Sequence, residues 1–328
     1  MADTIEQAKK FVLNWQKSID NDEITILSDK ISGVVSESYL WRGMHPFHEQ
    51  YGADSVIANF YTPFKTAFSS LRRRQDIFFA GKNEIDGFKS IWVASMGHFI
   101  GLFDKPFVGI PPHHKIAMIR YAEFHKFQAG RIVETALFID LLHLMAQTGL
   151  KPISEETGIH LVQPGPASHD GLLFTRQDEA EGKKTLKLIN RMISDINQGQ
   201  YANPQEELRQ CWHEDMLWWG PTGIGASYTI ERYIDQHQRP FRTQNEGRRF
   251  NGHICRMAEG NYGGFFGWPN LSLKPIGGYL GMPPFDGYAD MRVVDIYRRD
   301  GDKLAENWIF IDLLHFLKMQ GHDILAQI

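Results

Sequence analysis

The sequence predicts an α+β protein in which one domain occurs twice in tandem. The first observation is an internal repeat, because a segment that begins at Gly109 aligns without a gap to one that begins at Gly281. The string Phe-Ile-Asp-Leu-Leu-His occurs at matching positions in both, with Asp140 opposite Asp312. The second observation is the chain length of 328 residues, which suits about two domains. The third is the order of patterns in each copy, helical first and strand-like afterwards, which is typical of the α+β class.

Helical patterns open each copy. Apolar residues recur at helical spacing over residues 8–19, and the second copy has a counterpart that begins at Lys183. Residues 54–68 predict a further helix in the first copy, with Asp54 as its N-cap. These predicted helices precede the strand-like segments of each copy.

Strand-like segments and one short helix close each copy. Residues 132–140 and their partners 304–312 predict the last long strand of each domain. Each strand then continues into a short amphipathic helix that ends at a glycine, Gly149 in the first copy and Gly321 in the second. Helices followed by an antiparallel sheet are therefore expected twice.

The boundary between the copies follows from composition. Residues 156–178 are rich in proline, glycine and polar side chains, a composition that is typical of a linker. We therefore predict a first domain over residues 1–155 and a second domain over residues 179–328.

Charge and composition exclude several classes of partner. A net charge of -4 and a pI near 6.4 give no reason to expect a nucleic acid or an anionic membrane. No apolar run approaches the roughly 20 residues of a membrane span, and the amino-terminal sequence lacks the pattern of a signal peptide. Cys211 and Cys255 have no metal-ligand spacing and make no disulfide framework. A cytoplasmic location is the expected default.

The repeated segment resembles the closing signature of the SnoaL-like polyketide cyclases, which belong to the nuclear-transport-factor-like superfamily. That signature runs G-x-x-P-T-G, a strand, a D-G-R/K-I turn, E-H-W and then D-L-L. The matching segments are Gly281–Pro284, Asp300-Gly301, Glu306–Trp308 and Asp312–Leu314, and in the first copy Gly109–Pro112, Gly130–Ile132, Glu134 and Asp140–Leu142.

The resemblance implies a fold and a chemistry. The family fold is a curved antiparallel sheet wrapped by helices into a cone with a pocket inside, and two such cones in one chain imply a pseudo-dimer, which could pair again as a homodimer. Family cyclases use a pocket aspartate as general acid/base without a cofactor, and the matching positions are Asp140 and Asp312. The sequence departs from the family at the E-H-W histidine, which is Thr135 or Asn307, and at its tryptophan, which is Ala136 in the first copy.

The residues around the two aspartates support two interpretations. Asp140 and Asp312 follow apolar strings, so burial would raise the pKa of each carboxyl as general acid/base work near neutrality requires. Each aspartate also stands where a helix N-cap is expected, so each could instead accept a backbone hydrogen bond from the following helix.

Histidines are frequent in the first copy. His45, His48 and His98 are candidates to act with Asp140, and we single out His45 and His98 as catalytic candidates. The alternative is that they are exposed or hydrogen-bonded structural residues. Because H-x-H and H-E-x-x-H spacings are absent, we expect no metal site, and the family resemblance implies that no cofactor is needed.

Aromatic and polar side chains supply the candidates for substrate contact. Most of the eight tryptophans are expected in the core, yet a pocket lined by aromatic rings would suit a flat apolar ligand. The basic run Arg72–Arg74 and its counterpart Arg248-Arg249 either pair with carboxylates or bind an anionic substrate. The candidate substrate-binding residues are Trp41, His48, Trp92, Glu123, Phe138, Trp219, Trp268, Asp295, Asn307 and Trp308.

These observations favour a cofactor-independent acid/base enzyme of cyclase, lyase, isomerase or hydratase type. Its expected substrate is a small carbonyl-containing molecule of polyketide-like kind. The alternative is a non-catalytic protein of the same fold that binds a small molecule or serves as a scaffold. Smaller side chains at Thr135 and Ala136 than at Asn307 and Trp308 predict a roomier first pocket, so the first copy is favoured as the active one.

Overall fold

The computed structural model describes residues 4–153 and 156–328, which form two compact units. The first unit comprises Met1–Lys151, Ala167–Arg176 and Asp323–Ile328, and the second comprises Pro152–Pro166 and Gln177–His322. The segment predicted as a linker is thus divided between the units, and the predicted end of the first domain at residue 155 lies outside the described residues.

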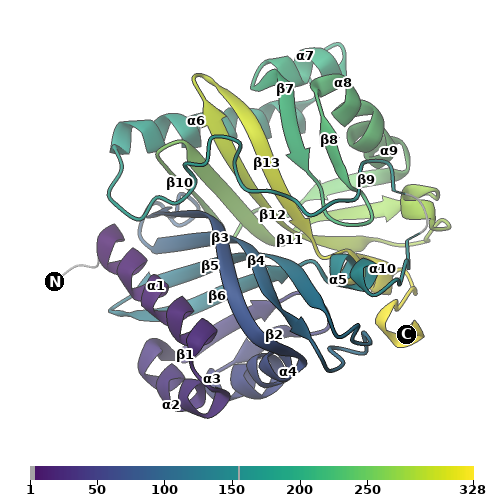
Figure 1. Ribbon diagram of the computed structural model, residues 1–328. Coiled ribbons are helices and arrows are strands. Elements are labelled where there is room, and N and C mark those ends of the chain that lie inside the picture. Colours follow the sequence, from purple (N-terminus) through teal and green to yellow (C-terminus); the bar gives the residue numbers. More distant parts are fainter. Residues whose placement is uncertain (1–3, 154–155) are drawn as a thin grey trace. The chain divides into compact units, whose positions relative to one another are not determined.

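The first unit contains a six-stranded sheet with helices packed against it (Figure 1). The strand order is β2-β1-β6-β5-β4-β3. Its strands are β1 (Val35–Gly43), β2 (His48–Tyr51), β3 (Phe68–Lys82), β4 (Ile91–Phe103), β5 (Ile116–Gln128) and β6 (Arg131–Ile139). Its helices are α1 (Ile5–Asn21), α2 (Ile24–Val34), α3 (Ala53–Val56), the π-helical turn η1 (Ile57–Tyr61), α4 (Thr62–Ala67), α5 (Leu141–Gln147) and the short η4 (Leu325–Gln327).

The second unit repeats this arrangement with a seven-stranded sheet (Figure 1). The strand order is β10-β11-β12-β13-β7-β8, and β9 pairs with β11. Its strands are β7 (Trp212–Trp219), β8 (Ala226–Tyr228), β9 (Asn245–Phe250), β10 (Cys255–Glu259), β11 (Tyr262–Pro275), β12 (Ala289–Asp300) and β13 (Lys303–Ile311). Its helices are α6 (Glu179–Gln198), α7 (Pro204–Arg209), α8 (Ile230–Tyr233), η2 (Ile234–Gln238), α9 (Arg239–Thr243), η3 (Tyr279–Gly281) and α10 (Leu313–Met319).

Both sheets are mixed, so the prediction of antiparallel sheets is wrong in this respect. β1 pairs with β6 in parallel, and β7 pairs with β13 in parallel, while the other pairs are antiparallel. Only strands joined by a short turn are restricted to antiparallel pairing. Because several helices and strands separate β1 from β6 in the chain, the sequence pattern of either strand does not reveal the direction of its partner.

Local sequence accounts for the start of two helices. The Thr4 side chain accepts from the Gln7 backbone and the Gln7 side chain accepts from the Thr4 backbone, so α1 begins with a capping box. The predicted cap at Asp54 is wrong, because Gly52 occupies the N-cap of α3 with a left-handed φ of 79° and no side chain caps this helix. None of the described helices has the length and apolarity of a membrane span.

Strand register places two acidic residues at equivalent positions. Glu123 on β5 pairs with Leu137, and Asp295 on β12 pairs with Ile309. Paired residues share a face and neighbours along a strand point to opposite faces. Asp295 therefore lies on the face of its sheet opposite to Trp308, which fixes the side on which a site with this acid can form.

A segment after the first sheet is part of the first unit. Leu172 forms an isolated parallel bridge with Phe78, and the Phe78 backbone N–H donates to the Gly171 carbonyl at 2.8 Å. The buried ammonium of Lys9 on α1 donates to the carbonyl of Leu173 at 2.7 Å. Residues of this segment thus form hydrogen bonds with α1 and β3 of the first unit.

Candidate functional site

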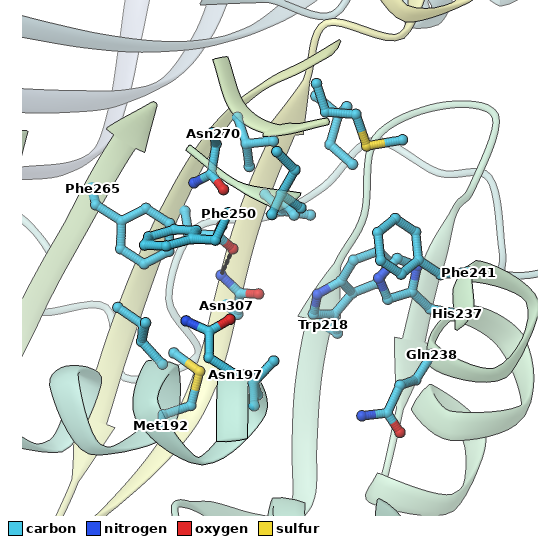
Figure 2. Close-up of a pocket in the computed structure, with 18 of the residues that line it drawn as sticks. Met192, Asn197, Trp218, His237, Gln238, Phe241, Phe250, Phe265, Asn270 and Asn307 are labelled. Atoms are coloured by element: carbon cyan, nitrogen blue, oxygen red, sulfur yellow. Dashed lines mark hydrogen bonds between the residues drawn. The ribbon is translucent and has the colours of Figure 1, made fainter. Parts of the chain in front are cut away.

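A cavity of about 170 Å³ lies in the second unit between its sheet and the helices α6, α7, α8, η2 and α9 (Figure 2). An apolar cavity of about 150 Å³ is enough to hold a benzene ring, so this one accommodates a small organic molecule. Its apolar and aromatic wall consists of Met192, Ile193, Ile196, Leu208, Trp212, Trp218, Tyr233, Phe241, Phe250, Phe265, Leu271, Met291, Val293, Tyr297, Ile309 and Ile311. Its polar wall consists of Asn197, His237, Gln238, Arg242, Arg248, His253, Asn270, Asp295 and Asn307.

Asp295 is the acidic group of this cavity. Its buried carboxylate accepts a hydrogen bond from the Asn307 side-chain amide at 3.0 Å, which is the dashed line in Figure 2. Burial raises the pKa of Asp295 to about 7, although hydrogen bonds from Asn307 and Tyr297 act in the opposite direction. The carboxyl group therefore exchanges between its acid and base forms near neutral pH.

The amide of Asn307 is itself held in place. It donates to the Ile296 backbone carbonyl at 3.1 Å as well as to Asp295. Because both amide hydrogens are used, the amide oxygen is left as an acceptor, and Figure 2 shows this side chain projecting into the space between the walls. Asn307 therefore positions Asp295 and offers an acceptor to a ligand.

Two imidazoles stack on aromatic rings of the wall. His237 lies over Trp218 with ring centroids 4.1 Å apart, and His253 lies over Phe265 with centroids 3.9 Å apart. Burial lowers the pKa of each histidine to about 3, with smaller effects from Arg242 and Arg256. Both rings are therefore neutral at physiological pH.

These imidazoles also carry unused polar atoms. In the part of the chain that the structure describes, the Nδ1 atoms of His237 and His253 are buried without a hydrogen-bond partner. The Trp212 indole nitrogen and the Gln238 amide oxygen, also in the wall, share this property. Buried polar atoms without partners are rare in folded proteins, so these four groups are available to a bound molecule.

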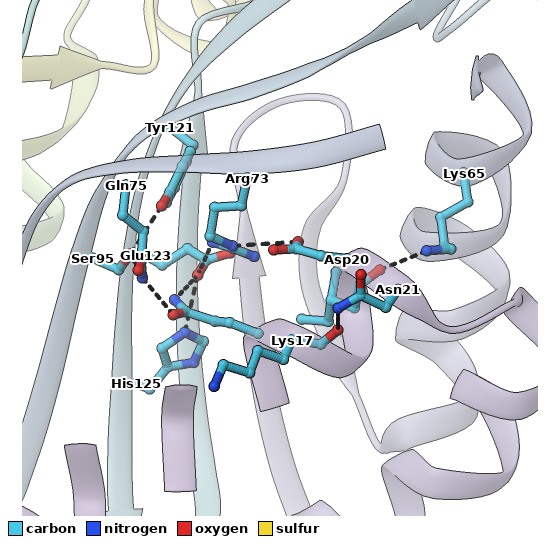
Figure 3. Close-up of polar contacts among 12 residues, drawn as sticks. Lys17, Asp20, Asn21, Lys65, Arg73, Gln75, Ser95, Tyr121, Glu123 and His125 are labelled. Atoms are coloured by element: carbon cyan, nitrogen blue, oxygen red, sulfur yellow. Dashed lines mark hydrogen bonds and ion pairs between the residues drawn. The ribbon is translucent and has the colours of Figure 1, made fainter. Parts of the chain in front are cut away.

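The equivalent position of the first unit holds an ion-pair network instead (Figure 3). The Glu123 carboxylate lies 2.7 Å from the Arg73 guanidinium, and it accepts from Gln16 at 2.9 Å. A His125 ring nitrogen lies 3.2 Å from the same carboxylate oxygen. Burial acts to raise the pKa of Glu123, but Arg73 and the hydrogen bond with His125 together hold it at about 2. Glu123 is therefore ionised at all physiological pH values.

The buried Arg73 side chain lies between aromatic rings and carboxylates. Its guanidinium lies 4.7 Å from the ring centroids of both Phe99 and Tyr121, and 3.5 Å from the Asp20 carboxylate. Cation–π contact and two carboxylates thus surround one buried cation. The two domains place an acid at the same register position and give it opposite electrostatic environments.

Comparison with known families identifies the first domain. Residues 15–148 match the family model described as SnoaL-like polyketide cyclase. Residues 15–148 form a SnoaL-like domain. The second domain lies outside this match, but the internal repeat and the equivalent strand order give it the same architecture as the SnoaL-like first domain.

Three similar solved structures each match less than half of the chain. One is a protein assigned as a SnoaL-like polyketide cyclase from Jannaschia sp. CCS1, with 19% identity, a TM-score of 0.34, and coverage of 44% of this chain and 94% of that chain. Another is an NTF2-like protein from Burkholderia xenovorans LB400, with 11% identity, a TM-score of 0.34, and coverage of 42% and 97%. A third is an NTF2-like protein from Burkholderia thailandensis E264, with 18% identity, a TM-score of 0.33, and coverage of 44% and 98%. A comparison with curated proteins finds no significant match.

In both the SnoaL-like domain and its repeat, the aspartate predicted as a catalytic group caps the final helix. Asp140 accepts from the His143 backbone N–H at 2.9 Å, and Asp312 accepts from that of His315 at 3.2 Å. Asp312 also lies 3.4 Å from the Arg292 guanidinium and is not part of the cavity wall. The capping role left open by the sequence is thus present, and a catalytic role for either aspartate stays a prediction.

The predicted histidines of the SnoaL-like domain lie at two places. The Nδ1 atom of His45 is 3.1 Å from the Nε2 atom of His48, and His45 is 4.0 Å from the Asp323 carboxylate. His98 on β4 is buried, 3.3 Å from Asp76. The carboxylates beside these histidines are therefore Asp323 and Asp76. That one of the histidines acts together with Asp140 stays a prediction.

Three further predicted residues of the SnoaL-like domain are part of its core. Trp41 is fully buried against Phe60, with ring centroids 4.9 Å apart. Trp92 is buried and donates to Ser90 at 3.0 Å. Phe138 is buried on the sheet face opposite to that of the Glu123 network, as its pairing register requires.

Three predicted tryptophans of the second domain lie outside the cavity wall. Trp308 donates to the Pro164 carbonyl at 3.0 Å from the opposite face of the sheet. The ring of Trp268 lies 4.1 Å beneath the Arg292 guanidinium. Trp219 is next to a wall residue but is not itself part of the wall. Of the second-domain candidates, the cavity thus brings together Asp295 and Asn307.

Sequence reasoning missed much of the wall. His237, Phe241 and His253 come from segments that have no counterpart in the aligned part of the repeat. Tyr297 could have been found, because it stands two residues after Asp295 and therefore shares its face. Within residues 4–153 and 156–328, no three His, Cys, Asp or Glu side chains are grouped so that they could hold a metal ion.

Proposed function

We propose that the cavity of the second domain is the active site of a cofactor-independent acid/base enzyme. Its substrate would be a small molecule with an aromatic or alicyclic ring and a carbonyl group, and the reaction would be of cyclase, lyase, isomerase or hydratase type. The observation that carries this proposal is the buried Asp295 carboxyl, with a pKa of about 7, in a cavity walled by aromatic rings.

The proposed first step is removal of a proton from the carbon next to the carbonyl. The Asp295 carboxylate takes the proton, the electron pair of the C–H bond forms an enolate, and Asn307 keeps the acid in place. The neutral His237 or His253 ring would donate an N–H to the enolate oxygen as its negative charge develops. The enolate can then be reprotonated at another carbon, attack a second carbonyl, or expel a leaving group.

The direct test measures hydrogen–deuterium exchange of 2-tetralone, a two-ring ketone, by proton NMR in D₂O. We expect the full chain to accelerate exchange at the carbons next to the carbonyl and Asp295→Asn to reduce this acceleration by about 100-fold or more, as for loss of a general base. Asp290→Asn is the matched control, because Asp290 is on the same strand, outside the cavity wall, and accepts from Ser272 at 2.6 Å. No acceleration by the full chain, or full acceleration by Asp295→Asn, would overturn the proposal.

The same assay separates this proposal from the helix-capping aspartates. If catalysis depended on Asp140 or Asp312, the variants Asp140→Asn and Asp312→Asn would lose exchange activity and Asp295→Asn would keep it. We expect instead that Asp140→Asn and Asp312→Asn keep exchange activity and that Asp295→Asn loses it. Circular dichroism of each variant verifies that it is folded.

The exchange rate is expected to rise with pH through a midpoint of about 7. Only the ionised form of Asp295 can accept a proton, and burial raises its pKa to about 7. The rate should therefore be low at pH 5 and level off above pH 8. A flat profile over this range, or a rate that falls as pH rises, would contradict the assignment of Asp295 as the base.

For the first domain, the ion-pair network favours a structural role. The Arg73 guanidinium lies 2.7 Å from the Glu123 carboxylate and, with His125, holds this carboxyl in its ionised form. We therefore propose that the first domain serves as a scaffold for the second. Pairing of the domains as a pseudo-dimer, and of the chain as a homodimer, stays a prediction.

A further inference from the structure

We propose that the substrate of the second domain carries a carboxylate, which binds at Arg248 while the ring lies beside Asp295. This inference deepens the proposed function, since it takes the same cavity as the substrate site. It concerns recognition rather than chemistry, so it is tested by binding alone.

A second pocket of about 310 Å³, which we call the outer groove, adjoins the cavity. Both are lined by Ile196, Asn197, Phe241, Arg242 and Arg248. A molecule in the inner cavity can therefore extend along these shared residues towards solvent. The inner part is largely aromatic, and the shared part carries two guanidinium groups.

The two arginines are not equivalent. Arg242 lies 2.7 Å from the Glu207 carboxylate, which also accepts from the Gln238 amide at 3.1 Å. Arg248 donates to the Ile196 backbone carbonyl at 3.0 Å, and no carboxylate among the described residues lies within 4 Å of it. Arg242 is thus neutralised by a fixed partner, and the charge of Arg248 is not.

Other charged groups nearby do not neutralise the positive charge of Arg248. Glu246 lines the outer groove but pairs with Lys274 at 3.2 Å. Burial and the positive charge of Arg242 lower the pKa of Arg248, while the negative charge of Glu207, which pairs with Arg242, acts in the opposite direction. Arg248 is an exposed residue, so an anion from solvent can reach its guanidinium. A cation that is repelled by a second cation is stabilised by an anion, and a guanidinium matches the two oxygens of a carboxylate.

The ring and the carboxylate of such a ligand occupy different parts of the site. Asp295 lines the inner cavity and is absent from the wall of the outer groove, whereas Arg248 lines both. A carboxylate that binds Arg248 on the side of the outer groove would then be separated from the reacting carbon by a chain of several bonds. This separation keeps the negative charge of the ligand away from the Asp295 carboxylate.

The test compares ligands that differ only in charge. Isothermal titration calorimetry on the full chain measures the affinity of 3-phenylpropionate and of the neutral 3-phenylpropan-1-ol, with benzoate and benzyl alcohol as a shorter pair. We expect the longer carboxylate to bind about tenfold or more tightly than its alcohol, and this ratio to fall towards one in Arg248→Gln. Arg249→Gln is the matched control, because the Arg249 guanidinium lies 3.7 Å over the Tyr288 ring and outside both walls.

Three results would overturn the proposal. They are equal affinity for acid and alcohol, a preference that survives Arg248→Gln, and a lack of measurable binding of either ligand up to millimolar concentration. Asp295→Asn separates this proposal from the proposed function, because it should keep the carboxylate preference while it loses proton exchange. If the full chain accelerates proton exchange but shows no preference for the carboxylate ligand, the carboxylate proposal alone is rejected. If it prefers the carboxylate ligand but does not accelerate exchange, the proposed enzyme activity alone is rejected.

Discussion

Replacing Arg73 by leucine is expected to destabilise the first domain by about 3–5 kcal/mol, because it leaves the buried Glu123 carboxylate without its cation. The remaining partners, Gln16 and His125, supply hydrogen bonds but no fixed positive charge. Hydrogen exchange followed by mass spectrometry, with peptides from β4 and β5, measures this change in the full chain without interference from the second domain.

A double variant distinguishes loss of charge balance from loss of packing. Arg73→Leu combined with Glu123→Gln should cost less than Arg73→Leu alone, since the second change removes the uncompensated charge. Arg74→Leu is the neighbouring control, because the Arg74 side chain is 57% exposed. Equal protection of β4 and β5 in Arg73→Leu and the unchanged chain would show that the ion pair contributes little.

Replacing Asp295 by asparagine is expected to raise the stability of the second domain at pH 8. The pKa of Asp295 is raised by burial from 3.8 to about 7, so the folded state binds the proton more tightly than the unfolded state. Stability therefore falls as pH rises from about 4 to about 7, and the full shift corresponds to about 4 kcal/mol at most. Asparagine cannot ionise, so the variant escapes this loss.

The predicted signature is a difference that grows with pH. Protection of β12 and β13 amides should be similar for the two proteins at pH 5 and higher for Asp295→Asn at pH 8, after correction for intrinsic exchange rates. Asp290→Asn, on the same strand, should show no such trend. A variant that is less stable at pH 8 than at pH 5, relative to the unchanged chain, would refute the raised pKa.

Much of the fold could be predicted because the repeat reports the same elements twice. The strands over 132–140 and 304–312 and the helices that follow agree with β6, β13, α5 and α10 to within one or two residues. Strand partners could not be predicted, since the parallel contact of β1 with β6 joins segments far apart in the chain. The SnoaL-like motifs of the first copy identified the family correctly.

The site was less predictable because its chemistry depends on partners from other strands. Glu123 and Asp295 occupy matching positions, yet Arg73 on β3 makes one of them a permanent anion. No pattern within either strand reports this contact. The preference for the first copy rested on smaller side chains at Thr135 and Ala136 than at Asn307 and Trp308. Ala136 and Trp308 lie on the sheet faces opposite to the two acids and so say little about cavity size. Thr135 and Asn307 lie on the same faces as the acids, and Asn307 lines the cavity of the second domain.

The division of the chain between its two units has a practical consequence for anyone who wishes to separate them. A gene truncated after residue 155 would encode the first sheet without Ala167–Arg176, so the Lys9 ammonium would lose the carbonyl oxygens of Leu173 and Thr175. It would also lack Asp323–Ile328, which the folded first unit takes from the far end of the chain. The tandem is therefore not a pair of exchangeable modules, and no single cut in the coding sequence yields two intact halves.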